Sequence, residues 1–253
     1  MVEKPASIAC KDGTELAYHH SPGNEPGVLF CTGFRSDMTG SKAVSLGDHC
    51  RDHNQQFTRF DYRGHGRSGG KFTDSTIGDW LNDALSILDS VTTGPQIAVG
   101  SSLGGWISFL MGRARPERLA AILGIAPAVD MTRRVQAGLP NQAKRALEQN
   151  GVWMRPSEYE PEGYPITQKL LDEGANHILL PGPIDFAGPV RILHGIKDDA
   201  VPWTLSLEIS AAMVSQDVEV TLVKNGDHRL SEPADIKRLL NSVDLLTAQL
   251  RGS

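Results

Sequence analysis

The feature that most constrains the fold is the pentapeptide Gly100-Ser101-Ser102-Leu103-Gly104, which stands between an apolar run and a helix-like segment. A Gly-x-Ser-x-Gly sequence in this setting forms a tight turn from a strand into a helix, called a nucleophile elbow. Glycine is needed at both ends because a Cβ at Gly100 or Gly104 would collide with neighbouring main chain. Ser102 is therefore predicted to present its hydroxyl at a helix N-terminus, where backbone N–H groups favour negative charge.

The residues around the pentapeptide decide whether it is a nucleophile elbow or an accidental pattern. The chain has 26 glycines in 253 residues, so a pattern of Gly and Ser can also arise in an ordinary loop. Residues 96–99 are typical of a short buried strand, and residues 106–111 continue as a mostly apolar helix. Ser101 lacks the glycine register, because Val99 and Leu103 stand two residues on either side of it.

Length and composition limit the classes of protein to which the chain can belong. A chain of 253 residues can bury roughly three quarters of its unfolded surface, so residues 1–253 are expected to form one domain without a metal, cofactor or disulfide. The net charge is −5 and no long block of like charge occurs, which argues against nucleic acid as a partner. The odd number of cysteines, Cys10, Cys31 and Cys50, predicts free thiols in a reducing compartment.

The sequence also carries an expectation about location. The first residues, Met1 to Pro5, contain no apolar signal core and no Arg-rich transit pattern. No stretch reaches the roughly 20 apolar residues that cross a bilayer. A cytoplasmic protein without a membrane span is predicted.

Strand and helix patterns alternate along the chain, which predicts a largely parallel sheet covered by helices on both faces. A turn signal at residues 11–13 predicts an opening hairpin. One face of the expected helix 76–91 is apolar and is assigned to the core: Ile77, Trp80, Leu81, Ala84, Leu85 and Leu88. The predicted strands are 7–10, 15–20, 27–31, 57–62, 96–99, 120–126, 190–194 and 218–223, and the predicted helices include 41–53 and 234–250.

The alternation stops at about residues 128–188, which contain many prolines and no convincing buried strand. Long excursions inside a compact domain are usually functional lids or disordered segments. The aromatic residues Trp153, Tyr159, Tyr164 and Phe186 favour an ordered segment. We expect a small helical cap over the strand ends; a decoration without substrate contact is the alternative.

A serine nucleophile needs a base, and His228 is the best placed of eight histidines. It lies in a polar turn, residues 225–229, after the last strand and before the last helix, on the same rim as Ser102. His65 and His194 also flank strand ends and compete with it. His19, His20, His49, His53 and His177 are expected to be surface or structural residues.

The base needs an orienting acid, and Asp198 is the expected residue. It stands three residues after Gly195 and four before Pro202, in a loop that follows a strand. Its neighbour Asp199 is expected to cap the following helix or to be solvated. The chain order Ser102, Asp198, His228 is the one found in α/β-hydrolases.

The tetrahedral intermediate of acyl transfer needs hydrogen-bond donors. In this fold they are main-chain N–H groups, one from the residue after the nucleophile and one from the loop after an early strand. These criteria select Leu103 and Phe34. Phe34 is also a candidate wall of the acyl pocket, with plain packing as the alternative.

One motif suggests a different class of enzyme. Residues Gly64 to Gly69 match Gly-x-Gly-x-x-Gly, a dinucleotide fingerprint. That fingerprint should open a helix and precede an acid at the end of a second strand, but residues 70–74 continue as a loop, and Asp83 and Asp89 fall within a helix. The glycines are therefore assigned to a tight turn.

Taken together, the chain resembles the α/β-hydrolases, and within them the mitochondrial enzymes of animals that act as palmitoyl-protein thioesterases and acyl-glucuronide esterases. The resemblance covers most of the chain and rests on residues 64–70, 100–106, 194–203 and 227–229 and on the cap residues Gly151, Val152, Trp153, Pro156, Ser157 and Tyr159. It implies a triad of Ser102, Asp198 and His228, in agreement with the spacing. The absence of a targeting segment suggests a bacterial relative.

These expectations combine into one reaction. Ser102 attacks an ester or thioester carbonyl, His228 moves the proton, and Phe34 and Leu103 hold the oxyanion. The expected partner is a small acyl ester or thioester, or an acylated protein. Hydrolysis of amide or C–C bonds, and a non-catalytic ligand-binding role, are the alternatives.

Overall fold

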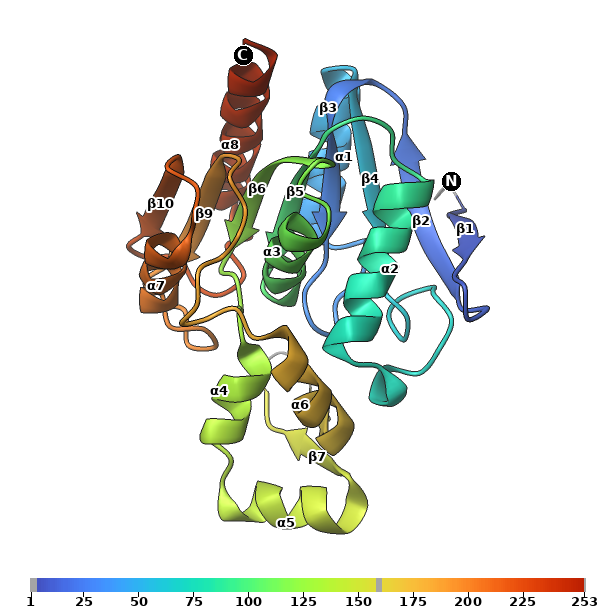
Figure 1. Cartoon of the computed structure of the whole chain (residues 1–253), viewed down its shortest axis with the longest axis vertical. Coiled ribbons are helices and arrows are strands. Elements are labelled where there is room, and N and C mark those ends of the chain that lie inside the picture. The colour runs from blue at the N-terminus through green and yellow to red at the C-terminus, as the bar shows by residue number, and fades with distance from the viewer. Residues whose placement is uncertain (1–3, 158–160, 253) are drawn as a thin grey trace.

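The computed structural model describes residues 4–157 and 161–252. Its centre is an eight-stranded sheet with the order β1-β2-β4-β3-β5-β6-β9-β10 (Figure 1). Strand β2 is antiparallel to β1 and β4, and all other neighbours in this sheet are parallel. The predicted mostly parallel sheet and opening hairpin are thus confirmed. The strands are β1 (Ala6–Ala9), β2 (Glu15–Ser21), β3 (Asn24–Cys31), β4 (Gln55–Phe60), β5 (Gln96–Ser101), β6 (Leu119–Ile125), β9 (Val190–Gly195) and β10 (Val218–Val223).

Helices cover both faces of the sheet, as predicted (Figure 1). Successive side chains of β3 enter opposite layers: Val28 and Phe30 pack with α1 and α8, while Leu29 and Cys31 pack with α2, α3 and α7. In the part of the chain that the structure describes, no helix is long and apolar enough to span a membrane. The covering helices are α1 (Ser41–Asp52), α2 (Ile77–Ser90), α3 (Leu103–Ala114), α7 (Thr204–Ala212) and α8 (Pro233–Arg251).

Helix α2 illustrates how local sequence fixes an element. Its N-cap, Thr76, accepts a hydrogen bond from the Asp79 backbone, and the Asp79 carboxylate accepts one from Thr76, which forms a capping box. Of the six residues assigned to its core face, four are fully buried and two are partly buried. The first group is Ile77, Trp80, Ala84 and Leu88, and the second is Leu81 and Leu85.

The chain between β6 and β9 leaves the sheet and folds beyond the carboxyl ends of the strands, at the bottom of Figure 1. It contains a two-stranded antiparallel sheet, β7 with β8, which corrects the expectation of an all-helical segment. Each strand has only four residues and β8 includes Pro165, so no alternating pattern could stand out in the sequence. The elements are α4 (Met131–Ala137), α5 (Asn141–Asn150), β7 (Val152–Arg155), β8 (Tyr164–Thr167), α6 (Gln168–Gly174) and the short 3-10 helix η2 (Ala175–His177).

A single carboxylate, Asp130, fastens the two ends of this insertion together. It precedes α4 and is fully buried. Its Oδ1 accepts a hydrogen bond from the Leu179 N–H at 2.8 Å, and its Oδ2 accepts one from the Leu180 N–H at 3.0 Å. The exit of the insertion is thereby tied to its entry.

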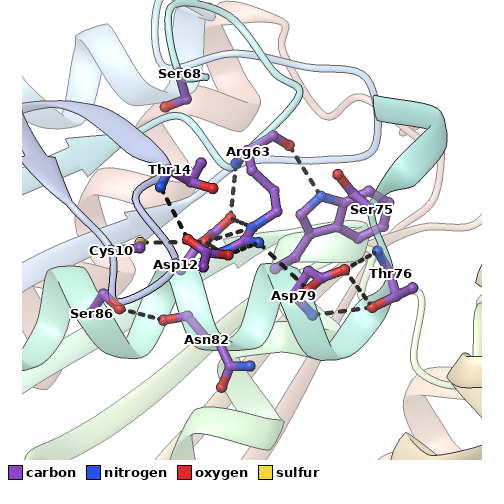
Figure 2. Close-up of polar contacts among 12 residues, drawn as sticks. Cys10, Asp12, Thr14, Arg63, Ser68, Ser75, Thr76, Asp79, Asn82 and Ser86 are labelled. Atoms are coloured by element: carbon purple, nitrogen blue, oxygen red, sulfur yellow. Dashed lines mark hydrogen bonds and ion pairs between the residues drawn. The ribbon is translucent and has the colours of Figure 1, made fainter. Parts of the chain in front are cut away.

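The glycine-rich loop after β4 is held by the polar cluster of Figure 2, which centres on Arg63. The Arg63 guanidinium lies 2.8 Å from the buried Asp83 carboxylate and 2.7 Å from Asp12. The loop then enters a short 3-10 helix, η1 (Phe72–Asp74), instead of opening an α-helix. Asp83 is therefore engaged in holding this loop, and the Gly64–Gly69 segment serves as a turn.

The three cysteines are free, as expected. Burial raises the pKa of the Cys31 thiol to about 11 and that of the Cys50 thiol to about 12. Both thiols are therefore protonated at neutral pH, which makes them poor nucleophiles.

Candidate active site

Ser102 occupies the sharp turn between β5 and α3. Its backbone has φ 54° and ψ −113°, a conformation that side-chain-bearing residues rarely adopt. A Cβ on Gly100 would collide with the Gly104 carbonyl, and one on Gly104 would collide with the Cys31 carbonyl. The glycines on either side of Ser102 are thus required by space, and they let the serine stand at the helix N-terminus.

His228 lies beside Ser102, on the loop that joins β10 to α8. Its Nε2 is 3.1 Å from the Ser102 Oγ, and its Nδ1 is 2.7 Å from the Asp198 Oδ2. The imidazole thus bridges a hydroxyl and a carboxylate that are distant in the sequence. This is the geometry in which a histidine can accept a serine proton while its other nitrogen is fixed.

Asp198 lies in the loop after β9, and its side chain is fully buried. Its Oδ1 accepts hydrogen bonds from the backbone N–H groups of Ala200 and Val201, at 2.9 and 2.8 Å. Burial alone would raise the pKa of this carboxyl, but hydrogen bonds from His194 and His228 outweigh it and hold the pKa well below its usual range. The carboxylate is therefore ionised at neutral pH.

The neighbouring acid, Asp199, does not cap a helix. It is exposed, and α7 begins at Thr204 with Trp203 as its N-cap residue and no side-chain cap. Of the two alternatives expected for Asp199, the structure places it in solvent.

The two competing histidines occupy separate places. His65 is buried, its Nε2 accepts a hydrogen bond from the Arg35 N–H at 3.2 Å, and burial lowers its pKa to about 4. A neutral His65 thus pins the loop after β3. His194 instead has its Nε2 3.0 Å from the Asp198 Oδ2, a contact that sequence reasoning missed. The signal in the sequence that could have indicated this contact is the short spacing of four residues between His194 and Asp198, with Gly195 between them.

The two expected oxyanion donors belong to backbone segments near Ser102. Leu103 is the first residue of α3, where the backbone N–H has no partner within the helix. Phe34 lies in the loop after β3; a Cβ built on the preceding Gly33 would be 3.6 Å from the Ser102 Cβ. Both backbone segments therefore approach the serine.

A cavity of about 700 Å³ opens at Ser102 and His228 and extends under the insertion. Of the aromatic residues singled out in the sequence, Trp153, Tyr164 and Phe34 line it, whereas Phe186 belongs to the main core. Tyr159 lies outside the described residues. Sequence reasoning missed the positively charged part of the lining, which comes from Arg35, Lys42, Arg134, Arg155 and Arg229.

The described polar groups near Ser102 do not form a metal site. Within residues 4–157 and 161–252, no group of three or more His, Cys, Asp or Glu side chains is arranged to hold a metal ion. The polar side chains around Ser102 instead bond to one another.

A mostly parallel sheet with a serine at the turn from a central strand into a helix defines an α/β-hydrolase. Over residues 25–171 the chain matches the family described as Hydrolase_4, serine aminopeptidase S33. It is 44% identical over 240 residues to the mitochondrial palmitoyl-protein thioesterase ABHD10 of Bos taurus, covering 94% of this chain and 78% of the relative. The chain therefore belongs to the α/β-hydrolase family.

Two solved structures extend the comparison to the whole fold. Mouse α/β-hydrolase domain-containing protein 10 superposes with a TM-score of 0.91 at 43% identity, covering 98% of this chain and 100% of that one. A putative hydrolase from Agrobacterium vitis S4 gives a TM-score of 0.91 at 36% identity, covering 96% and 98%. The predicted resemblance is thus confirmed along nearly the entire chain.

The expectation of a cytoplasmic protein is wrong by the same comparison. The relatives from Bos taurus, Mus musculus and Homo sapiens are all named as mitochondrial. The composition of a folded domain does not record its compartment, because delivery depends on short segments that are read by receptors. A moderate net charge and free thiols suit either compartment.

Proposed function

We propose that this protein is a serine hydrolase that cleaves acyl thioesters and carboxylic esters through Ser102, His228 and Asp198. The observation that carries the proposal is the position of His228, with Nε2 3.1 Å from the Ser102 hydroxyl and Nδ1 2.7 Å from a buried carboxylate. The relatives named as palmitoyl-protein thioesterases favour a thioester among the acyl substrates.

The first half of the reaction transfers the acyl group to the protein. His228 Nε2 takes the Ser102 proton as Oγ attacks the carbonyl carbon, and the carbonyl oxygen becomes an oxyanion held by the N–H groups of Leu103 and Phe34. Asp198 stabilises the imidazolium and fixes its tautomer. When the C–S or C–O bond breaks, His228 returns the proton to the leaving thiol or alcohol.

The second half releases the acid. Water gives a proton to His228 and attacks the acyl carbon, and the bond to Ser102 Oγ then breaks as the proton passes back to the serine. Loss of one oxyanion donor typically costs on the order of 3 kcal/mol of transition-state stabilisation. Asp198 remains a carboxylate throughout.

Residues 128–188 are proposed to act as a cap on a single hydrolase domain of residues 1–253. The support is the cavity. It is lined both by residues of loops that follow strands of the main sheet and by Met131, Val135, Trp153 and Tyr164 of the insertion. Apolar and aromatic walls suit an acyl chain. An acylated protein or a small thioester would then place its acyl chain under the cap and its carbonyl at Ser102.

Amide hydrolysis is the second candidate, because the matching family is described as serine aminopeptidase S33. The test compares kcat/KM on a thioester, an oxygen ester and an amide that share one acyl group, with Ser102→Ala as the control. The proposal expects Ser102-dependent turnover with the thioester and ester well above the amide. A clear preference for the amide would reverse the assignment.

A further inference from the structure

His194 is a second histidine on the candidate catalytic acid. It lies on β9, fully buried, with its Nε2 3.0 Å from the Asp198 Oδ2. This is the same oxygen that His228 Nδ1 approaches at 2.7 Å. Two imidazoles therefore share one carboxylate oxygen, and the reaction steps described above use only one of them.

The hydrogen-bond partners of His194 define its protonation. An ionised carboxylate only accepts hydrogen bonds, so the His194 Nε2 that faces Asp198 must carry a proton. The same N–H lies 3.1 Å from the Val201 carbonyl. The Nδ1 of a neutral ring is then an acceptor, and the Ser206 hydroxyl donates to it from 2.6 Å. Ser206 belongs to α7, so this helix fixes the orientation of the ring.

We propose that His194 is a positioning residue that holds the Asp198 carboxylate for His228 and takes up part of its charge; the role rests on the proposed function. The Asp198 Oδ1 is anchored by two backbone N–H groups, of Ala200 and Val201. Among residues 4–157 and 161–252, the hydrogen-bond partners of Oδ2 are the two imidazoles. Without His194, this oxygen would be held by His228 alone and would present more negative charge to it.

The consequence is a change in the pH dependence of the reaction. A carboxylate oxygen with one fewer donor attracts positive charge more strongly, so loss of the His194 donor would shift the acidic limb of the rate profile upward. The other charged groups around this pair lie on the same loops or line the same cavity, and they stay unchanged when only His194 is replaced. On these loops they are Lys197, Asp199, Asp227 and Arg229. Lys42, whose Nζ donates to the Arg229 carbonyl, lines the same cavity as His228, together with Arg35, Arg134 and Arg155.

Two amide variants separate the two hydrogen bonds of His194, the one to Asp198 and the one to Ser206. In His194→Gln the terminal amide nitrogen falls near the position of Nε2, which keeps a donor for Asp198. In His194→Asn the shorter side chain can still accept from Ser206 but does not reach Asp198. The Asn variant should move the acidic limb of the kcat/KM profile upward by about half a pH unit and lower kcat about tenfold with KM unchanged.

The Gln variant should retain the wild-type pH profile. His20→Gln is the matched control, because His20 also bonds to a hydroxyl, that of Thr58, and lies on β2, toward the opposite edge of the sheet from β9. Identical profiles for the Asn and Gln variants would overturn the positioning role, whatever the loss of rate. A wild-type rate that does not depend on Ser102 would instead overturn the proposed function, and the positioning role with it.

A measurement on the wild-type protein keeps the proposal testable if a variant does not fold. Nitrogen NMR of ¹⁵N-histidine-labelled protein distinguishes a protonated ring nitrogen from an unprotonated one. For His194 we expect a protonated Nε2 and an unprotonated Nδ1 at neutral pH. The opposite tautomer would leave Asp198 without a donor from His194 and would overturn the proposal.

Discussion

At the scale of single residues, the backbone of Ser102 stores strain that the surrounding structure supports. A non-glycine residue in a sparsely populated region costs on the order of 1–3 kcal/mol. The Ser102 N–H donates to the Ile125 carbonyl, and its carbonyl accepts from Ala128 and Gly105. These bonds to β6, to the segment after it and to α3 hold the turn, so the hydroxyl is presented in one direction.

His65 gives a pH-dependent contribution to stability. Burial lowers its native pKa to about 4, whereas the unfolded chain binds this proton near pH 6.5. Between these values the unfolded state binds more protons, so the stability is complete above pH 6.5 and falls as the pH drops toward 4. Lowering the pH from 7 to 4.5 should cost on the order of 2–3 kcal/mol through this residue.

The measurement is urea unfolding of wild type and His65→Gln at the two pH values. The glutamine can still accept from the Arg35 N–H but does not titrate, so its loss of stability should be smaller by that amount. His53→Gln, at an exposed position, should behave like wild type. Parallel losses in wild type and His65→Gln would contradict the assignment.

At the scale of elements, Asp130 is expected to hold the two ends of the insertion together. Asp130→Ala leaves the buried N–H groups of Leu179 and Leu180 without acceptors, which should lower the free energy of unfolding by on the order of 2–4 kcal/mol. Urea unfolding gives the magnitude. Hydrogen exchange should show faster exchange at these two amides.

Asp172→Ala is the control for this change. Asp172 is exposed on α6 and accepts a hydrogen bond within its own helix turn, from Gln168. Its replacement should alter stability by less than about 0.5 kcal/mol. Equal effects of the two substitutions would show that Asp130 does not anchor the insertion.

Sequence patterns located the elements of the sheet because each carries a strong local signal. The run Ile97-Ala98-Val99 is wholly apolar and directly precedes the glycine-flanked serine, and the apolar face of α2 recurs along a helix of 14 residues. Strands β7 and β8 have four residues each and depend on one another and on the cluster of Leu147, Ile166 and Leu171. Their pairing is a tertiary outcome, which is why local pattern missed it.

The candidate site could be predicted to a similar degree. Ser102, Asp198 and His228 were selected by motif and register, and the structure brings them together. The roles of His65 and His194 could not be read, because each depends on a partner in space: the Arg35 N–H for one and the Asp198 carboxylate for the other. The burial and the hydrogen-bond partners of these two side chains cannot be inferred from a single sequence.

At the scale of the whole molecule, the cavity between the sheet and the insertion should set the acyl-chain preference. Trp153 lines the cavity, while its neighbour Met154 is 46% exposed and does not. Successive side chains of a strand point to opposite faces, so the pair is a natural comparison.

Trp153→Ala should lower kcat/KM for a long-chain thioester about tenfold, because it removes apolar contact with the chain. Turnover of an acetyl thioester should change less than about twofold. Met154→Ala should change neither. A uniform loss on long and short chains would place the Trp153 effect outside chain binding.

The most direct test of the central claim is covalent labelling by a fluorophosphonate, in which an activated serine oxygen displaces fluoride from phosphorus. Intact-mass measurement should show one label on wild type and on Ser101→Ala, none on Ser102→Ala, and much slower labelling of His228→Ala. Labelling of Ser102→Ala at the wild-type rate, or no labelling of the folded wild-type protein, would contradict the account.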